Sequence, residues 1–171
     1  ASVVSHASCP VVVVREDNHV TDSTKYGPVV VGVDGSEVSQ KATAYAFREA
    51  QARGAALIAV HTWMDMQVQA SLAGLSAAQS EWADIEKEQS ELLTENLKEP
   101  REEYPEVEVK KLITRDRPVS ALTEAAEGAQ LLVVGSHGRG GFKGMLLGST
   151  SRALLQSAPC PMMVVRPDEE S

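Results

Sequence analysis

Hydrophobic residues in this chain gather into short apolar runs, separated by longer stretches with helical periodicity. Runs of this length between turn residues are typical of strands buried on both faces of a parallel sheet, and one further segment alternates like a strand. The predicted strands are Pro28–Val33, Ala56–Thr62, Val107–Ile113, Gln130–Val134 and Met162–Val165.

Helices are expected between these strands. Ser36 has the side chain of an N-cap, Gly54 fits a helix stop, and the longest helix should end before Pro100. The residues 63–76 lack clear periodicity and are interpreted as an excursion. The predicted helices are Val38–Arg53, 77–98, Pro118–Glu127 and Ser149–Ser157.

Strands that alternate with helices predict right-handed βαβ units and a mainly parallel sheet with helices on both faces. Ligands of such α/β folds bind beyond the carboxyl ends of the strands, where the strand order reverses. If the first and fourth strands flank that point, the turn 34–36 and the loop 135–141 face each other.

The loop after the fourth strand is rich in glycine and leads into a helix that opens at Ser149. Such a loop offers backbone N–H groups and a positive helix end to an anion. Glycine is needed there because a Cβ would keep the main chain away from a phosphate. A nucleotide is therefore the expected ligand.

Two common glycine motifs do not fit this loop. A Walker A loop needs Gly-Lys followed by Ser or Thr, but Lys143 is followed by Gly144. A dinucleotide fingerprint needs a third glycine where Lys143 stands, and it belongs on the first strand of a domain.

The spacing matches a third pattern: Gly135, two residues, Gly138, nine residues, Gly148 and then Ser149. It resembles the ATP-binding motif of the universal stress protein family, and the resemblance covers Gly27–Pro167. It implies a doubly wound, mainly parallel five-stranded α/β sheet with strand order 3-2-1-4-5 and helices on both faces. It also implies ATP as the ligand, with Mg²⁺ bound through the phosphates.

The motif and the strand order together predict a nucleotide site. The phosphates are expected at the loop and helix start, and the ribose near Asp34 and Gly135. The Val-Asp-Gly-Ser pattern implies that Asp34 contacts the ribose or a phosphate-bound Mg²⁺, although a turn-forming Asp is the alternative. Arg139 either meets the triphosphate or stays solvated. The resemblance also implies, by position, adenine contacts from Val60, His61 and Thr62, because the family's adenine contacts come from this strand end. The other expected nucleotide-binding residues are Val33, Asp34, Gly35, Ser36, Gly135, Gly138, Arg139, Gly140, Gly148, Ser149 and Thr150.

Three residues near the expected site carry other interpretations. His61 is expected to pack near the adenine, and His137 to be a solvent-exposed loop residue without a catalytic partner. Asp116-Arg117-Pro118 stands where the family usually has Gly-x-Pro, so one edge of the adenine pocket departs from the pattern.

The amino-terminal residues repeat the end of the domain. Ala7–Arg15 and Ala158–Arg166 share Ala, Cys, Pro, two Val and Arg in register. We interpret 1–15 as the remnant, or last strand, of a preceding homologous domain. Residues 16–27 are then a linker, 28–167 the nucleotide-binding domain and 168–171 a tail.

The final strand of this domain is a sheet edge, which invites pairing. We therefore expect an antiparallel edge strand, formed either within the chain or by exchange with a second chain. The expected partners are Val11, Val12, Val13 and Val14 with Met162, Met163, Val164 and Val165.

Composition limits the function classes. The net charge of −8 argues against nucleic acid as the main partner. A signal peptide and a membrane-spanning apolar run are not recognised, so a cytoplasmic protein is expected. Cys9 and Cys160 lack zinc-ligand spacing and are interpreted as buried, reduced thiols.

No nucleophile–base pair is visible, and no catalytic residue is assigned. The favoured hypothesis is an ATP-binding regulatory or stress-response protein with slow hydrolysis at most. The alternatives are an adenine-nucleotide hydrolase or transferase, and a nucleotide-free dimerisation module. The choice among ATP, ADP and a cyclic nucleotide stays open.

Overall fold

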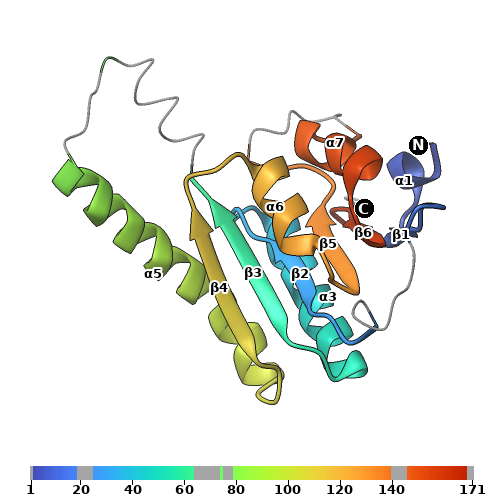
Figure 1. The fold of residues 1–171 in the computed structure, drawn as a ribbon, viewed down its shortest axis with the longest axis horizontal. Helices are drawn as coiled ribbons and strands as arrows, with labels where there is room; N and C mark the ends of the chain where they lie inside the picture. Colours follow the sequence, from blue (N-terminus) through green and yellow to red (C-terminus); the bar gives the residue numbers. More distant parts are fainter. Residues whose placement is uncertain (1, 19–24, 64–73, 75–78, 140–145, 169–171) are drawn as a thin grey trace.

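The computed structural model describes residues 2–18, 25–63, 74, 79–139 and 146–168. Within these residues, one sheet is covered by helices on both faces (Figure 1). The strands are β1 Val11–Val13, β2 Val29–Gly32, β3 Leu57–Thr62, β4 Val109–Thr114, β5 Leu131–Gly135 and β6 Met162–Val165. The helices are α1 Ser2–His6, α3 Glu37–Arg53, α5 Gln79–Glu103, α6 Pro118–Ala126 and α7 Ser149–Ser157.

The sheet has six strands in the order β1-β6-β5-β2-β3-β4. Every pair from β6 to β4 is parallel, and β1 pairs with β6 antiparallel. The five parallel strands have the predicted order 3-2-1-4-5, so the predicted fold class is confirmed. The order reverses between β2 and β5, which are direct neighbours.

The core forms two apolar layers because successive strand residues point to opposite faces. Val30 and Leu132 belong to the layer that includes Leu122 of α6 and Leu154 of α7. The opposite layer packs β-strand residues against α3 and α5, with Phe47 fully buried. Because β2 is buried on both faces, the residues that follow it are held against the neighbouring strand ends.

Helix α3 has the predicted signals at both ends. Ser36 is its N-cap, and its Oγ accepts a hydrogen bond from the N–H of Ser39 (3.2 Å). Gly54 is in the left-handed conformation, with φ of 59°, and its N–H closes the last turn. These local signals fix where α3 starts relative to the end of β2.

The predicted end of α5 is wrong, since the helix continues through Pro100 to Glu103. A proline removes one helical hydrogen bond, which usually ends a helix. Here Tyr104 stacks on Phe47 at a ring-centroid distance of 6.2 Å, and its N–H donates to the carbonyl of Pro100 (2.9 Å). Tertiary packing therefore holds the last turn. The predicted start at residue 77 and most of the excursion 63–76 lie outside the described residues.

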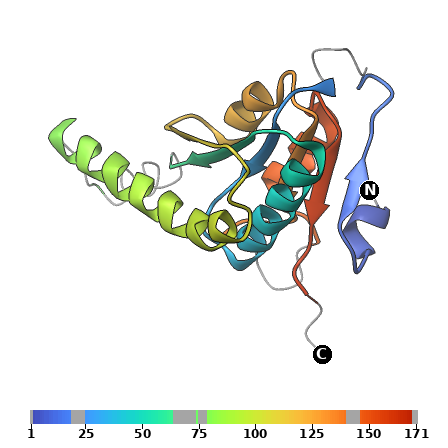
Figure 2. The ribbon, with the colours of Figure 1, turned by 90° about the horizontal axis from the view of Figure 1, so that it is seen from below.

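Strand β1 lies along the outer edge of β6 (Figure 2), so the expected antiparallel pairing occurs within the chain. Val12 is the central residue of β1, and it stands opposite Met163. In the repeat of Ala7–Arg15 by Ala158–Arg166, Met163 is the counterpart of Val12 itself. The ladder is therefore centred on equivalent residues, as in an isologous interface.

The two ends of this ladder differ in their side-chain contacts. Arg166 donates through Nη1 to the carbonyl of Ala7 (3.0 Å). At the opposite end, the carbonyl of Ala158, the counterpart of Ala7, accepts from the Asn18 amide (3.3 Å). Arg15, the counterpart of Arg166, pairs instead with Asp17.

The cysteines are placed differently from the expectation. Cys160 is buried and Cys9 is exposed, so the prediction of two buried thiols is wrong for Cys9. Burial raises the pKa of the Cys160 thiol to about 11, against a smaller opposing effect of a backbone hydrogen bond from Leu132. The difference arises because the body of the domain covers Cys160 and leaves Cys9 open to solvent.

Deleting residues 1–15 should bare the apolar outer edge of β6 and promote association through it. An unpaired strand edge offers free N–H and C=O groups to another chain. Light scattering should then show a larger mass for the deleted form than for the parent. Deletion of residues 1–6 removes α1 but keeps β1, and should leave the mass unchanged. Equal masses for the parent and the 1–15 deletion would contradict the role given to β1.

Candidate functional site

The turn after β2 and the loop after β5 meet at the switch point, as the topology predicts. A Cβ built on Gly138 would lie 2.6 Å from Oδ2 of Asp34. A Cβ on Gly35 would lie 2.7 Å from Nη2 of Arg139. The carboxylate of one loop thus touches the main chain of the other, and a guanidinium covers the turn. This is the region where the sequence places the nucleotide.

Asp34 is held in a compact turn at the start of α3. Its N–H donates to the Ser39 hydroxyl (3.0 Å), and its Oδ1 accepts from the N–H of Ser36 (2.8 Å). Gly35 adopts φ of 80°, a conformation that favours glycine. The bonded Oδ1 fixes the carboxylate, so Oδ2 is the oxygen directed at Gly138.

A side chain would collide with its surroundings at Gly135 and Gly138, and it would be tightly packed at Gly148. A Cβ on Gly135 would lie 2.8 Å from Cγ1 of Val38 in α3. A Cβ on Gly148 would lie 3.1 Å from the Cα of His137. Together with Gly138 against Asp34, the motif glycines let α3, the loop and α7 approach one another closely. The spacing of the motif therefore has a packing basis in addition to any ligand contact.

Ser136 connects this loop to the neighbouring strand and helix, and it is fully buried. Its N–H donates to the carbonyl of Val165 at the end of β6 (2.7 Å). Its own carbonyl accepts from the N–H of Gly148 (2.7 Å) and from the Ser151 hydroxyl (3.0 Å). The same hydroxyl of Ser151 also donates to the carbonyl of Gly135 (2.8 Å).

The start of α7 is suited to an anion. Gly148 is its N-cap and contributes no side-chain hydrogen bond to the first turn. The N–H groups at the first turn of a helix have no partner within the helix, and the helix dipole is positive there. Ser149 is exposed and Thr150 is half-buried, so this helix end is open to solvent.

The ends of β2 and β3 form the other side of the site. His61 is buried; its Nδ1 donates to the carbonyl of Val33 (2.7 Å), and its Nε2 lies 2.8 Å from Oε1 of Gln89. The N–H of Val33 donates to the carbonyl of Val60 (2.8 Å). The structure thus places Val33, Val60, His61 and Thr62 together beside Asp34, and uses His61 as a buried link between β2 and α5.

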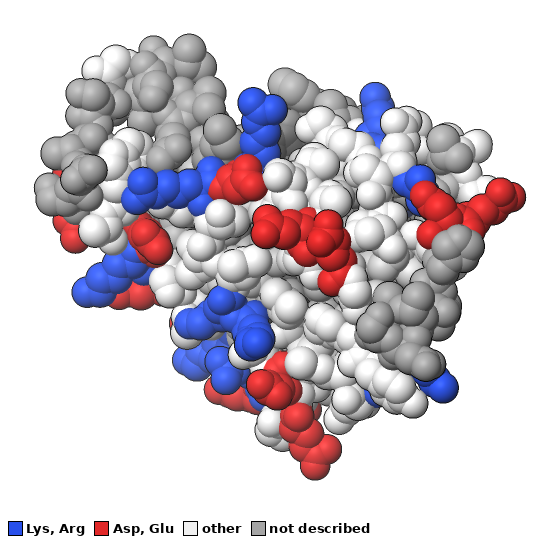
Figure 3. Space-filling view, viewed as in Figure 1, with Lys and Arg blue, Asp and Glu red and all other residues white. Residues whose placement is uncertain are grey.

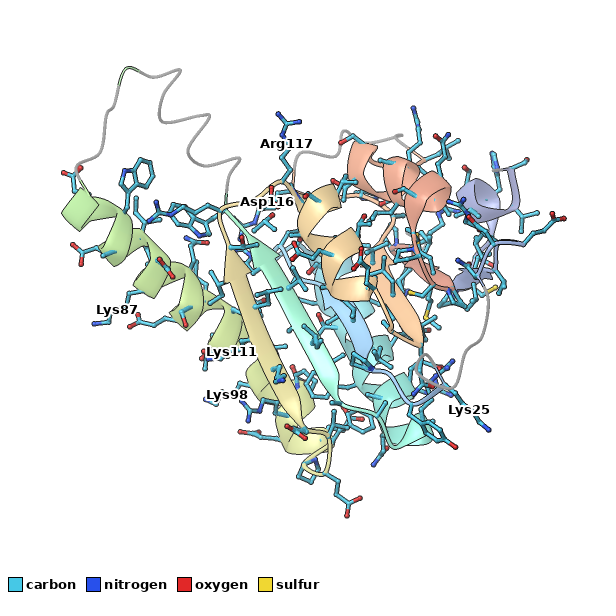
Figure 4. The ribbon with its side chains drawn as sticks, viewed as in Figure 1. Lys25, Lys87, Lys98, Lys111, Asp116 and Arg117 are labelled. Carbon is cyan, nitrogen blue, oxygen red and sulfur yellow. The ribbon has the colours of Figure 1, made fainter. Side chains whose placement is uncertain are left out.

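The loop after β4 contains the segment that departs from the family pattern. Asp116 accepts from the N–H of Arg117 (2.7 Å), and Pro118 starts α6 as predicted. Figure 4 shows Arg117 pointing away from the sheet, above the start of α6. Beside it, the guanidinium of Arg115 lies 4.9 Å from the ring centroid of Trp63 and 5.9 Å from that of Trp82. This stack joins α5 to the strand ends.

Several functional expectations have different outcomes. Gly140 lies outside the described residues. His137 is only half-buried, and its Nδ1 is 3.0 Å from the Ser136 hydroxyl, so it is more enclosed than predicted. Sequence reasoning missed the buried polar residues that support the two loops. Only Ser136 and Ser151 lie beside the glycine motif in the sequence. The buried polar residues that support the loops are Ser39, Gln89, Ser136 and Ser151.

The charges around the site decide which ions it suits. Among the described residues, no group of three or more His, Cys, Asp or Glu side chains is arranged to hold a metal ion. Asp34 supplies a single carboxylate there, which fits Mg²⁺ only as an ion shared with phosphates. Over the described part of one molecular face, acidic and basic side chains are interspersed (Figure 3).

The structure is that of an α/β protein in which a glycine-rich loop faces the turn after β2 at the switch point. The family model "Universal stress protein family" matches residues 25–166, and the chain belongs to that family. In the part of the chain that is described, no helix is long and apolar enough to cross a membrane.

Comparison with individual known proteins also identifies relatives in the universal stress protein family. The chain is 46% identical over 166 residues to universal stress protein Rv2005c of Mycobacterium tuberculosis, covering 97% of this chain and 54% of the relative. The chain thus spans about half the length of the curated relatives it matches. It is similar in fold to a Lactobacillus plantarum universal stress protein, with a TM-score of 0.66, 23% identity, and coverage of 82% of this chain and 98% of that one.

A further solved structure is described as a universal stress protein in complex with cAMP. It is 27% identical to this chain and has a TM-score of 0.56. The match covers 82% of this chain and 96% of that one.

Proposed function

We propose that this chain binds ATP at the facing ends of β2 and β5 and acts as a nucleotide-dependent regulatory protein of the stress response. In this proposal, the phosphates bind against Gly138, Gly148, Ser149 and Thr150. The ribose lies near Asp34 and Gly135. Cytoplasmic location belongs to the same proposal.

The observation that carries the proposal is the contact between Gly138 and Asp34. It brings the Asp34 carboxylate, which we propose binds the ribose, within reach of a loop that leads to an uncapped helix start. A nucleotide needs these two features side by side, since its ribose offers hydroxyl donors and its phosphates are anions. The similar structure with bound cAMP supports an adenine nucleotide as the ligand class.

Magnesium fits the site only together with the nucleotide. Oδ2 of Asp34 would hold the ion from the protein side, and phosphate oxygens and water would complete its coordination. The ion would neutralise phosphate charge close to a carboxylate. Arg139 lies over Gly35 and is the described cation nearest this turn, so we assign it a triphosphate contact.

Binding with little or no turnover is favoured over catalysis. Phosphoryl transfer needs a positioned base or nucleophile in addition to charge stabilisation. Asp34 is used by the turn, and His61 is bonded at both ring nitrogens. An adenine-nucleotide hydrolase or transferase is the alternative function, and a nucleotide-free dimerisation module is a further one.

We also propose that the chain is the second unit of a tandem protein, with 1–15 the last strand of the first unit. The coverage of 54% of the relatives supports this organisation. Exposed apolar residues support it too: Val12 and Val14 are 47% and 65% exposed. The repeat makes their counterparts Met163 and Val165, which are 7% and 0% exposed. The body of a preceding unit would cover the two valines in the same way.

Replacing Gly138 by valine should abolish ATP binding. The new side chain must displace the Asp34 carboxylate, and it holds the loop away from the phosphates. We expect the dissociation constant to rise more than about a hundredfold, or ~3 kcal/mol, in calorimetry. The thermal unfolding midpoint of the variant serves as the control for folding. Unchanged ATP affinity in a folded Gly138→Val protein would refute this site assignment.

Protein purified under native conditions should release an adenine nucleotide on denaturation, identified by chromatography and mass. Steady-state assays with ATP and Mg²⁺ should then find slow or no hydrolysis. Several turnovers per minute would favour the hydrolase alternative, and a rate on the order of 10 per second would overturn the binding-protein proposal. Absence of nucleotide from the native protein would favour the dimerisation module.

A further inference from the structure

Ser151 lies in the first turn of α7 but outside the glycine motif. Its side chain is buried, with 3% exposure, although Ser149 and Thr150 before it reach solvent. The hydroxyl is directed away from the open helix end and toward the loop after β5. A buried hydroxyl without a partner would be costly, so its partners show what it stabilises.

Those partners are two consecutive carbonyl groups of the loop. The Ser151 hydroxyl donates to Gly135 (2.8 Å) and Ser136 (3.0 Å). The Ser136 carbonyl also accepts from the N–H of Gly148 (2.7 Å). The Ser151 hydroxyl, which shares its proton between two carbonyl groups, and one main-chain bond therefore join the start of α7 to the loop.

We infer that Ser151 is a positioning residue for the phosphate groups of the ligand. It holds the loop that contains Gly138 against the helix start that contains Ser149 and Thr150. These two segments are separated by nine residues, so their N–H groups act on one anion only if their separation is fixed. Preorganised donors bind an anion better than donors that must be ordered during binding.

This inference rests on the proposed nucleotide site and makes a narrower claim. Ser151 should matter more for the phosphates than for the base and ribose, because, of the residues expected near the base and ribose, it bonds only Gly135, through the carbonyl group. Comparison of the affinities for ATP and adenosine separates the contribution of the phosphates from that of the base and ribose. If Ser151 had only a structural role, its loss would weaken the binding of both ligands equally or would lower the stability of the protein alone.

The test is calorimetry of ATP and adenosine binding to the full chain and its variants. Ser151→Ala should raise the dissociation constant for ATP about tenfold, which is the effect expected for losing a buried hydrogen bond that orders the site. The dissociation constant for adenosine should stay within about twofold of the parent value. Ser151→Thr keeps the hydroxyl and should restore ATP affinity.

The matched control is Ser157→Ala on the same helix. The Ser157 hydroxyl donates to the carbonyl of Ala153 within α7 (3.0 Å), and the residue is exposed. This variant should bind both ligands like the parent. Equal loss of ATP affinity in Ser157→Ala and Ser151→Ala would overturn the inference, because it would reflect helix stability alone.

Parental ATP affinity in Ser151→Ala, or equal loss of ATP and adenosine, would also overturn it. If circular dichroism shows that Ser151→Ala is unfolded, Ser151→Cys replaces it. The cysteine side chain has a similar shape to serine but is a weak hydrogen-bond donor. Weaker ATP binding with unchanged adenosine binding would support the inference, and ATP affinity equal to that of the parent would refute it. A parent that binds neither ligand refutes the proposed function, and the inference with it.

Discussion

The site depends on the close approach of two main-chain segments that follow neighbouring parallel strands. Gly138 contacts the Asp34 carboxylate at a distance that leaves no room for a Cβ. Because β2 and β5 pair directly and are buried on both faces, this contact rests on the two central strands of the sheet. The glycines at 135 and 148 allow α3 and α7 to close in around it.

Strand β6 contacts the loop of the candidate site at its carboxyl end and the edge strand β1 along its outer side. Its last residue, Val165, accepts the N–H of Ser136, and its outer edge pairs with β1. The register of that pair, with Val12 opposite its own counterpart, is the arrangement that two equivalent units would adopt. The amino-terminal residues therefore complete the sheet next to the strand that supports the loop after β5.

Much of the fold could be predicted because its signals are local. Apolar runs mark the parallel strands, and Ser36, Gly54 and Pro118 mark helix ends by their own backbone preferences. The end of α5 could not be predicted, because Tyr104 and Phe47 are far apart in the sequence and their stacking overrides Pro100. The exposure of Cys9 likewise depends on what packs over it.

In the candidate site, too, the features with local sequence signals could be predicted and those that depend on tertiary packing could not. Spaced glycines and the strand order indicated which loops would meet, and the structure places those loops together. Ser136 and Ser151 carry no such signal, since their hydrogen bonds form only after α7 has packed beside the loop. The stack of Trp63, Arg115 and Trp82 also joins three separate segments, so no spacing in the sequence predicts it.

The most direct test of the central claim is an NMR titration of the ¹⁵N-labelled chain with ATP and Mg²⁺. The largest shifts are expected for the amides of Gly138, Ser149 and Thr150, where the phosphates should bind. The amide resonances of Lys110 and Lys111, in the edge strand β4, should not shift. Saturable shifts confined to β4 or α5, with the loop and the α7 start unaffected, would contradict the proposed site.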